Sequence, residues 1–282
     1  MRIAVTGGSG FVGTYLMKEL KKRGENVINL DISKGIDITE WEKIKNIKKF
    51  DLIFHLAAKS FVPESYKNPR EFYYNNVIGT LNILELCRKH NAKIIFASSY
   101  VYGTPRYFPI DEDHPIQGFN PYAQSKIIGE NICEGYHRDF NIPVVIMRPF
   151  NIYGPGQNIN FLIPTIIEQA KKGRIILKNS KPKRDYVYID DVIDAYIKCL
   201  EYDDTSFKIF NIGSGMSYSV MELAEIVAEN YRNEIKISFS EESRKNEIMN
   251  TVADISNIQK LLGWKPKIDL NKGIARVVER LQ

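Results

Sequence analysis

The chain has 282 residues, of which 44% are hydrophobic, so it can bury the core of one large domain or of a domain with an added lobe. Its net charge of +5 is spread over many separated lysines, and neither a basic stripe for nucleic acid nor an exposed aromatic platform is evident. The apolar runs are short and interrupted, so we expect no signal peptide, no membrane span and a cytoplasmic protein. Three well-separated cysteines, Cys87, Cys133 and Cys199, argue against a disulfide framework and against a metal site.

The first 31 residues have the pattern of a dinucleotide-binding unit. A buried strand, a helix and a second strand are predicted at residues 2–6, 14–23 and 27–30. Between the first strand and the helix, the spacing G-x-x-G-x-x-G is formed by Gly7, Gly10 and Gly13. These glycines let the backbone turn tightly and approach a pyrophosphate at the helix N-terminus. Asp31 closes the second strand, where its carboxylate can bind an adenosine ribose and would repel a 2′-phosphate, so we expect NAD rather than NADP.

Strands and helices continue to alternate after this unit, which predicts an α/β fold with a Rossmann-type, doubly wound parallel sheet. Further strands are predicted at residues 50–58, 93–97 and 144–149. Helices are predicted at residues 40–47, 72–90, 122–136, 163–172, 190–201 and 220–231. From residue 151 onward the pattern loosens into glycine and proline turns. We therefore expect a Rossmann domain over residues 1–150 and a smaller lobe over residues 151–282, with some of its segments returning to the first domain.

Polar residues near the expected cofactor allow more than one interpretation. Asp37 and Ile38 lie where an adenine could rest against the sheet edge, or they form a helix cap. His55 stands alone on an apolar strand, which favours a core residue over a catalytic base. Ala57 and Ala58 end that strand, and their small side chains would let a cofactor pass close above it.

The candidate catalytic residues lie at the start of the helix predicted over residues 122–136. Tyr122 and Lys126 are four residues apart, so their side chains share one helix face. A phenol is a poor base near neutral pH, but an ammonium and an oxidised nicotinamide nearby would lower its pKa. Ser98 follows the strand over residues 93–97, and its hydroxyl could bind the same substrate oxygen. The three side chains together could remove a proton from a secondary alcohol while a hydride leaves for the nicotinamide.

Motifs along nearly the whole chain resemble the extended short-chain dehydrogenase/reductases of the NAD-dependent epimerase/dehydratase family, which act on nucleotide sugars. The matching segments are residues 6–13, 55–58, 76–80, 98–103, 122–126, 148–156, 184–191, 211–213 and 262–266. In this order and spacing they are specific for the family and much less so for the substrate. The resemblance implies NAD as cofactor, a nucleotide diphosphate sugar as substrate and a sugar-binding role for the C-terminal lobe.

The resemblance also implies roles for individual residues. Tyr122 is the implied acid/base, Lys126 its partner, and Ser98 the substrate-binding hydroxyl, with Ser99 as the less favoured alternative. Cofactor-binding positions are matched by Gly7, Gly10, Phe11, Val12, Gly13, Asp31, Asp37, Ile38, Leu56, Ala57, Ala58, Asn76, Tyr122, Lys126 and Phe150. Substrate-binding positions are matched by Ser98, Ser99, Tyr122, Asn151, Arg184 and Arg244. An arginine suits a diphosphate because its fork can bind two oxygens at once, although either arginine could instead form a surface ion pair.

Within the family, the chain resembles 4-epimerases such as those that interconvert UDP-glucose and UDP-galactose. The 4,6-dehydratases carry acidic residues directly after the catalytic Ser/Thr, and the decarboxylases need a comparable glutamate. Ser99 and Tyr100 occupy those positions here and cannot do that work. The alternative is an NAD(P)H-dependent reductase of a GDP- or dTDP-linked 4-keto-6-deoxy sugar, because residues 54–60 and 263–266 resemble such reductases. A non-catalytic NAD(P)-sensing protein is disfavoured because Tyr122 and Lys126 are both present.

The resemblance further implies a homodimer. In the family two helices from each subunit form a four-helix bundle, and residues 76–90 and 122–136 match them.

Overall fold

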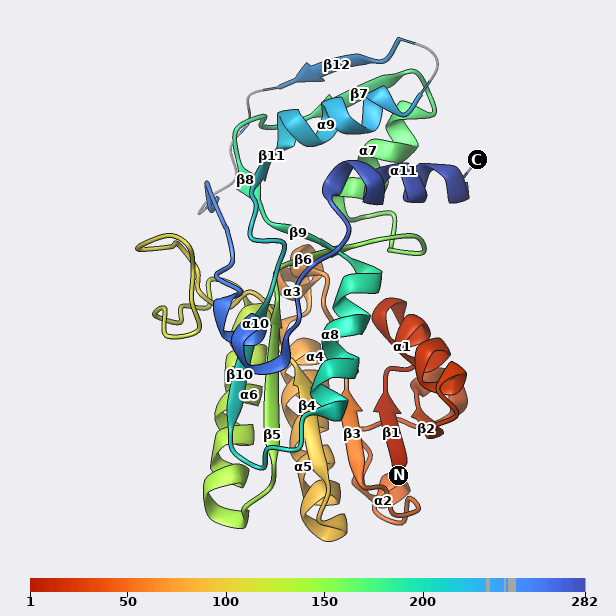
Figure 1. Cartoon of the computed structure of the whole chain (residues 1–282), viewed down its shortest axis with the longest axis vertical. Helices are drawn as coiled ribbons and strands as arrows, with labels where there is room; N and C mark the ends of the chain where they lie inside the picture. Colours follow the sequence, from red (N-terminus) through yellow and green to blue (C-terminus); the bar gives the residue numbers. More distant parts are fainter. Residues whose placement is uncertain (232–233, 241, 243–246, 282) are drawn as a thin grey trace. The chain divides into compact units, whose positions relative to one another are not determined.

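The computed structural model describes residues 1–231, 234–240, 242 and 247–281. Within them, a six-stranded sheet has the order β10-β5-β4-β3-β1-β2. Its strands are β1 (Arg2–Thr6), β2 (Asn26–Leu30), β3 (Leu52–His55), β4 (Lys93–Ala97), β5 (Val144–Pro149) and β10 (Lys208–Ile212). Strands β1 to β5 pair in parallel (Figure 1). The predicted α/β fold with a Rossmann-type parallel sheet is therefore confirmed.

Helices cover both faces of this sheet (Figure 1). They are α1 (Phe11–Lys22), α2 (Trp41–Ile44), α3 (Val62–Lys67), α4 (Pro69–Tyr73), α5 (Gly79–His90), α6 (Pro121–Phe140) and α8 (Ile189–Glu201). Alternate strand residues such as Ile53 and Ile94 form one core with Leu84 of α5 and Cys133 of α6. On the other face the Phe54 ring packs edge-on against Tyr196 of α8, with 5.9 Å between ring centroids. Both faces are buried, as a parallel sheet requires.

The helix predicted over residues 72–90 is interrupted. It consists of α4, a π-helical turn (Tyr74–Ile78) and α5. Such turns insert one extra residue per turn and often occur at functional sites. The turn carries Asn76, whose side chain is buried. The periodicity of the apolar residues located the helix but could not reveal this insertion, because it depends on what Asn76 contacts.

The chain divides into two compact units. Unit 1 comprises Met1–Gly103, Pro115–Pro149 and Ile193–Phe210, and unit 2 comprises Thr104–His114, Phe150–Val192 and Asn211–Gln282. Among the described residues, no helix combines the length and apolarity needed to cross a membrane.

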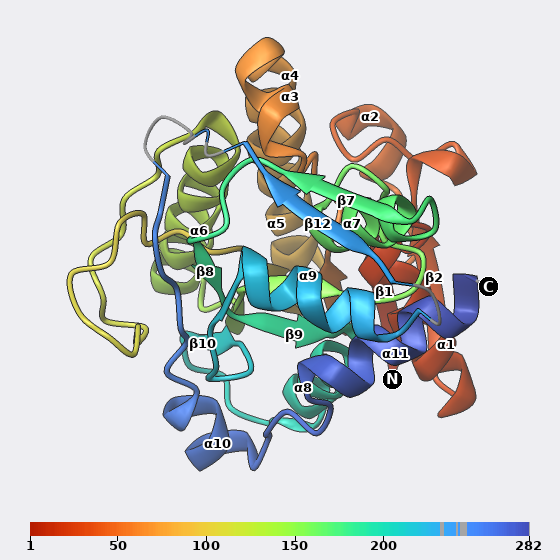
Figure 2. The ribbon, with the colours of Figure 1, turned by 90° about the horizontal axis from the view of Figure 1, so that it is seen from above.

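Unit 2 is built from short strand pairs and helices. Its strands are β6 (Asn151–Tyr153), β7 (Arg174–Leu177), β8 (Lys183–Arg184), β9 (Tyr186–Tyr188), β11 (Tyr218–Ser219) and β12 (Lys236–Phe239). They pair as β6 with β9 and β8 with β11. Strand β7 pairs with β12, and these two lie side by side in Figure 2. Its other helices are α7 (Leu162–Ala170), α9 (Val220–Glu229), α10 (Ser256–Leu262) and α11 (Leu270–Leu281). The Asp185 carboxylate connects distant parts of this unit by accepting hydrogen bonds from the main chains of Ser214, Gly215 and Ala253.

Candidate active site

The loop between β1 and α1 packs so closely that two of its positions require glycine. Gly7 has φ +66°, and a Cβ there would lie 2.9 Å from the Cα and N atoms of Ala57. A Cβ on Gly13 would lie 2.1 Å from the Gly7 carbonyl oxygen. Gly10 is the N-cap of α1 and offers no side-chain cap. The helix N-terminus can therefore face an anion, which its partial positive charge favours, and this cradle fits the pyrophosphate of NAD.

Asp31 lies at the end of β2, nearly buried. Its Oδ2 accepts a hydrogen bond from the Ser9 main-chain N (3.0 Å), and its Oδ1 accepts one from the Ser33 N (2.9 Å). Burial disfavours the carboxylate, but the hydrogen bonds from Ser33 and Ser9 outweigh it and lower the pKa of Asp31. An ionised carboxylate beside the glycine loop suits a ribose diol and disfavours a phosphate.

Asp37 and Ile38, the uncertain pair of the sequence analysis, make local contacts. Asp37 Oδ1 accepts hydrogen bonds from the N and Oγ1 atoms of Thr39, at 2.9 and 2.8 Å. Ile38 is buried, and a Cβ on Gly79 would lie 2.6 Å from its Cδ1. Asp37 thus closes a local turn and Ile38 packs against α5, whereas Glu40 is the N-cap of the following helix α2. The pair therefore forms no helix cap, and its contact with adenine stays a prediction.

His55 is a packed core residue, as its apolar strand indicates. Thr80 Oγ1 donates its hydrogen to the Asn76 carbonyl (2.6 Å), so it must accept one from His55 Nε2 (3.0 Å). Nδ1 is then the acceptor for the Thr6 hydroxyl at 2.7 Å. Burial and the charge of Lys126 lower the pKa of His55 to about 3, so the ring is neutral. We call Thr6, His55 and Thr80 the neutral brace.

The neutral brace supports the main chain that follows β3. The Thr6 hydroxyl oxygen accepts hydrogen bonds from the N–H groups of Leu56 and Ala57, both at 3.1 Å. These residues and Ala58 are half-buried. They lie against the glycine loop through the close contact of Gly7 with Ala57, where the sequence predicts that the cofactor passes.

Asn76 connects this segment to α6. Its amide hydrogens are donated to the Lys59 carbonyl (3.0 Å) and the Ser125 hydroxyl (2.9 Å), and its Oδ1 accepts from the Lys59 N (2.8 Å). Both hydrogens of the amide are therefore used within the protein. Asn76 holds the strand-end segment in place, and direct contact of its side chain with NAD stays a prediction.

Helix α6 aligns three functional side chains. Asn120 caps it by accepting a hydrogen bond from the Ala123 N (2.8 Å), and Pro121 occupies the first turn. Tyr122, Lys126 and Glu130 follow at intervals of four residues and share one face. This arrangement was only partly expected, because Glu130 was not singled out in the sequence.

Lys126 is buried, and its Nζ lies 4.6 Å from the centroid of the Phe96 ring. Burial lowers the pKa of Lys126 to about 8, and Cys133 and Glu130 offset this effect only in part. Lys126 therefore gives up its proton more readily than a solvated lysine does.

Burial shifts the pKa of the Tyr122 phenol. It raises this pKa, and a hydrogen bond with Ser99 offsets part of that rise. The lowering expected from Lys126 together with an oxidised nicotinamide stays a prediction for the protein with NAD bound.

The two serines after β4 face different partners. The Ser98 hydroxyl donates a hydrogen bond to Glu130 Oε1, whereas the Ser99 hydroxyl donates one to the Tyr100 carbonyl at 3.5 Å. The position of Ser98 four residues before the tyrosine of the V-Y-G motif favoured Ser98 as the substrate-binding hydroxyl. That role for Ser98, with Ser99 as the alternative, stays a prediction.

Glu130 also forms a buried ion pair. Arg148 Nε lies 3.0 Å from Glu130 Oε1 and Nη2 lies 2.6 Å from Oε2, and both side chains are almost fully buried. Arg148 Nη1 also donates to the Tyr102 hydroxyl at 3.1 Å. Burial disfavours the guanidinium charge, but the hydrogen bond to Glu130 outweighs it and raises the pKa of Arg148. We call Ser98, Glu130 and Arg148 the charged brace.

Two of the predicted substrate residues, Asn151 and Arg184, lie in unit 2, whereas Ser98, Ser99 and Tyr122 lie in unit 1. The side-chain amide of Asn151 donates to the Asp185 carbonyl (3.0 Å). Phe150, predicted to bind the cofactor, is buried at the start of a segment of unit 2. Arg184 Nη1 donates to the carbonyls of Lys183 (2.8 Å) and Ile248 (2.6 Å). Arg244 lies outside the described residues.

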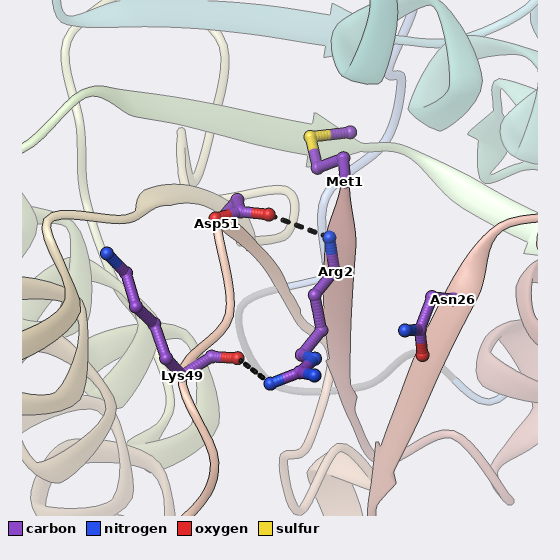
Figure 3. Close-up of a pocket in the computed structure, with 5 residues that line it drawn as sticks. All are labelled: Met1, Arg2, Asn26, Lys49 and Asp51. Carbon is purple, nitrogen blue, oxygen red and sulfur yellow. Dashed lines mark hydrogen bonds between the residues drawn. The ribbon is translucent and has the colours of Figure 1, made fainter.

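A separate pocket of about 400 Å³ lies where β1 begins, lined by Met1, Arg2, Asn26, Lys49 and Asp51 (Figure 3). Arg2 N donates to Asp51 Oδ2 at 2.7 Å, and Arg2 Nη1 donates to the Lys49 carbonyl at 3.0 Å. These groups bind one another on an exposed surface, at the end of β1 opposite the glycine loop. The pocket therefore has no role in the chemistry described above.

Comparison with known proteins gives consistent matches over the whole chain. Residues 3–213 match the family described as the NAD dependent epimerase/dehydratase family. A putative UDP-glucose 4-epimerase of Methanocaldococcus jannaschii is 35% identical, over 98% of this chain and 97% of the relative. UDP-glucuronic acid decarboxylase 3 of Arabidopsis thaliana is 32% identical, over 99% and 88%. The crystal structure of a UDP-glucose 4-epimerase from Thermotoga maritima with UDP-glucose superposes with a TM-score of 0.91 at 28% identity, covering 100% of this chain and 98% of the other.

Proposed function

Because the chain belongs to the NAD-dependent epimerase/dehydratase family, we propose that it is an isomerase that epimerises a UDP-sugar at carbon 4 with NAD as cofactor. The predicted family and its cofactor NAD are thereby confirmed. The observation that carries the proposal is the pair Tyr122 and Lys126 on one face of α6, with Lys126 Nζ 4.6 Å from the centroid of the Phe96 ring in β4. Ser98 and Ser99 directly follow β4, and these residues belong to unit 1, which also carries the glycine loop.

These side chains can provide the proton transfers of a 4-epimerase. Tyr122 would take the proton of the 4-hydroxyl and later return it, with the Ser98 hydroxyl, or that of Ser99 as the alternative, bound to the same oxygen. Bound NAD would supply hydride acceptance from carbon 4 and its return to the other face of the sugar. Charge on Lys126 would stabilise the Tyr122 phenolate during the transfer. No net oxidation results, so the reaction needs no added reductant.

The residues after β4 disfavour dehydratase and decarboxylase chemistry. The position at which the resemblance places a glutamate is held by Tyr100, whose hydroxyl donates to the Gly103 carbonyl at 2.6 Å. A phenol bound in this way provides no carboxylate base. We therefore favour epimerisation, even though decarboxylases are among the relatives.

The reductase alternative receives less support from the structure than from the sequence. Within the reductase-like segment over residues 263–266, Trp264 is buried and its Nε1 donates to the Asp191 carbonyl at 2.9 Å. The main-chain N–H groups of Lys267 and Ile268 bind the Asp191 carboxylate, both at 3.0 Å. The segment thus anchors the C-terminal part of unit 2, so its likeness to reductases reflects packing. Asp31 also disfavours NADPH.

We propose that unit 2 holds the nucleotide diphosphate sugar. Two main-chain carbonyls orient the Arg184 guanidinium, whose fork suits a diphosphate oxygen pair. The amide of Asn151 is held by the Asp185 carbonyl. A role for Arg244 remains a prediction from the sequence.

We further propose a cytoplasmic homodimer that pairs α5 and α6 in a four-helix bundle. Leu81 of α5 and Phe140 of α6 are exposed, and the Arg88 guanidinium lies 5.5 Å from the Phe140 ring centroid. Covering such apolar side chains would favour association. Light scattering should give the mass of a dimer for the wild type and a monomer for Leu81→Glu.

The proposed activity is tested by proton NMR of the protein with UDP-glucose, UDP-N-acetylglucosamine or UDP-glucuronate, with catalytic NAD and no reductant. We expect a second anomeric signal that grows to a fixed ratio with one of these sugars. Tyr122→Phe should fold and bind NAD but lose turnover by roughly 10²- to 10⁴-fold. Oxidation of NADH or NADPH by a 4-keto sugar, with no epimer formed in any sample, would favour the reductase.

A further inference from the structure

A second glycine-containing turn of the chain, over residues 213–215, encloses a carboxylate of the protein itself. The main-chain N atoms of Ser214 and Gly215 donate to Asp185 Oδ1 and Oδ2, at 2.6 and 3.0 Å. A Cβ on Gly213 would lie 2.7 Å from Asp185 Oδ2, and Gly215 has φ +73°, so neither position suits a larger residue. Consecutive N–H groups in a turn form a concavity for an anion, and here the Asp185 carboxylate fills it.

The Asp185 carboxylate is completely buried. Besides the two N–H groups of the turn, Oδ1 accepts the Ser214 hydroxyl at 2.7 Å and Oδ2 accepts the Ala253 main-chain N at 3.0 Å. Burying a carboxylate is unfavourable unless such donors replace water. Each oxygen has two donors, so one side chain ties two distant chain segments together.

The two segments tied by this carboxylate also hold Arg184. The turn leads into β11, which pairs with β8 so that Tyr218 lies opposite Arg184. The other segment, residues 248–253, contains the Ile248 carbonyl, which accepts a hydrogen bond from Arg184 Nη1 at 2.6 Å. The place of the guanidinium therefore depends on two segments that meet at the Asp185 carboxylate.

Asp185 holds Asn151 as well, through its main chain. The Asp185 carbonyl oxygen accepts hydrogen bonds from the N and Nδ2 atoms of Asn151, each at 3.0 Å. Asn151 and Arg184 are the described residues of unit 2 that we propose to bind the nucleotide diphosphate sugar. One residue thus contacts the supports of both.

We propose that Asp185 is a positioning residue of the nucleotide diphosphate site, which orders the supports of Arg184 and Asn151 before the ligand binds. The proposal rests on the proposed function only in assigning the nucleotide diphosphate sugar to unit 2. The Asp185 carboxylate does not bind the ligand itself, because donors of the protein occupy both of its oxygens. A guanidinium ordered in advance binds more tightly, because less conformational entropy is lost on binding.

The test measures the binding of UDP to the NAD-loaded protein by calorimetric titration. Asp185→Asn keeps the size of the side chain but replaces one acceptor oxygen by an NH₂ group, which leaves two of the donors without an acceptor. We expect the dissociation constant of UDP to rise by roughly 10- to 100-fold, the effect of losing one well-placed hydrogen bond to a charged group. The KM for the sugar nucleotide should rise in parallel with kcat much less affected, because the lost interaction is made in the ground state as well as in the transition state.

The matched control is another buried carboxylate of unit 2. Asp191 Oδ1 and Oδ2 accept the main-chain N atoms of Lys267 and Ile268, both at 3.0 Å, and these donors lie between α10 and α11. Asp191→Asn should lower the free energy of unfolding as Asp185→Asn does, yet bind UDP as the wild type does. A merely structural role of Asp185 would give both variants the same affinity for UDP under conditions in which both are folded.

Ser214 provides a milder variant in case Asp185→Asn does not fold. Ser214→Ala removes the hydroxyl that binds Asp185 Oδ1 and leaves the three main-chain donors in place. We expect the dissociation constant of UDP to rise by about 3- to 10-fold, as the loss of one hydrogen bond implies. Ser214→Thr keeps the hydroxyl and should restore the affinity.

The outcomes separate the two proposals. If the Asp185 and Ser214 variants bind UDP as the wild type does, or if Asp191→Asn weakens binding equally, Asp185 positions nothing and the inference is overturned. If the wild type binds none of UDP, dTDP and GDP, unit 2 holds no nucleoside diphosphate and the inference also fails. If the affinities follow the expected order while the wild type epimerises no UDP-sugar, the positioning role stands and the proposed function fails.

Discussion

The neutral brace and the charged brace occupy similar places but use opposite electrostatics. The neutral brace contacts the segment that follows β3, and the charged brace contacts the segment that follows β4. These two strands are neighbours in the sheet. The neutral brace binds the main-chain N–H groups after β3 through a histidine held uncharged. The charged brace binds the loop after β4 through a buried ion pair.

The difference shows how each segment is held for its proposed task. The segment after β3 is expected to lie under NAD, whose charges would respond to a titrating neighbour, and a histidine with a pKa of about 3 adds no charge near neutral pH. The loop after β4 needs one fixed direction for a hydroxyl. A carboxylate held at both oxygens by Arg148 supplies it.

The largest difference should appear when each brace loses one partner. Glu130→Ala leaves the Arg148 charge buried without its carboxylate, and we expect the free energy of unfolding to fall by about 3–5 kcal/mol. Thr80→Val removes one neutral hydrogen-bonding group and should lower the free energy of unfolding by about 1–2 kcal/mol. Urea denaturation of both variants measures the contrast, and equal losses would show that the two braces do not differ in this way.

The pH dependence of stability distinguishes the braces next. The pKa of His55 is about 3 in the folded protein and 6.5 ordinarily. Above pH 6.5 the neutral His55 ring contributes its full share to the free energy of unfolding. As the pH falls below 6.5, the unfolded chain binds a proton at His55 that the folded protein does not bind. The free energy of unfolding therefore decreases toward pH 3. Between pH 6.5 and pH 4.5 the free energy of unfolding should decrease by about 2 kcal/mol because of His55.

Urea denaturation over this pH range, with His55→Gln as the control, measures that contribution. The slope of stability against pH should be smaller in His55→Gln than in the wild type. Identical slopes would mean that His55 is not held neutral.

The hydroxyl of Thr6 should matter for both stability and cofactor binding. Thr6→Val removes the hydroxyl that binds the N–H groups of Leu56 and Ala57 and the His55 ring. We expect the free energy of unfolding to fall by about 1–3 kcal/mol. Thr6→Ser keeps the hydroxyl and should retain most of the stability. Calorimetric titration should show weaker NAD binding in Thr6→Val than in Thr6→Ser, and equal affinities would separate the neutral brace from the cofactor site.

The smallest effect concerns the edge of the proposed NAD site. Asp31→Asn keeps the shape of the side chain and removes its charge, so NAD affinity should fall by about tenfold, the equivalent of one ribose hydrogen bond. The ratio of the affinity for NAD to the affinity for NADP should decrease as well. Asp51→Asn, where the carboxylate instead binds the Arg2 N, is the charge-matched control and should bind NAD as the wild type does.

Features that depend on short-range spacing could be predicted from the sequence. The glycine loop follows from Gly7 and Gly13, whose close contacts lie within the loop and at the neighbouring strand end. The shared face of Tyr122 and Lys126 follows from helix geometry. Asn120 and Pro121 mark where that helix begins.

Features that depend on contacts between distant segments could not be predicted. Ser98 and Glu130 are 32 residues apart, and their pairing depends on how the loop after β4 meets α6. The buried Arg148 appeared in a motif, but its partner was not evident, because an ion pair between a strand and a helix leaves no periodic pattern in the sequence.

The most direct test of the account follows the hydrogen at carbon 4. The protein with catalytic NAD is given the active UDP-sugar carrying deuterium at that carbon, in ordinary water, and the epimer is analysed by NMR and mass spectrometry. The account predicts that the epimer retains deuterium at carbon 4, because the same hydride is removed and returned within one active centre. Replacement of the deuterium by solvent hydrogen would contradict the account.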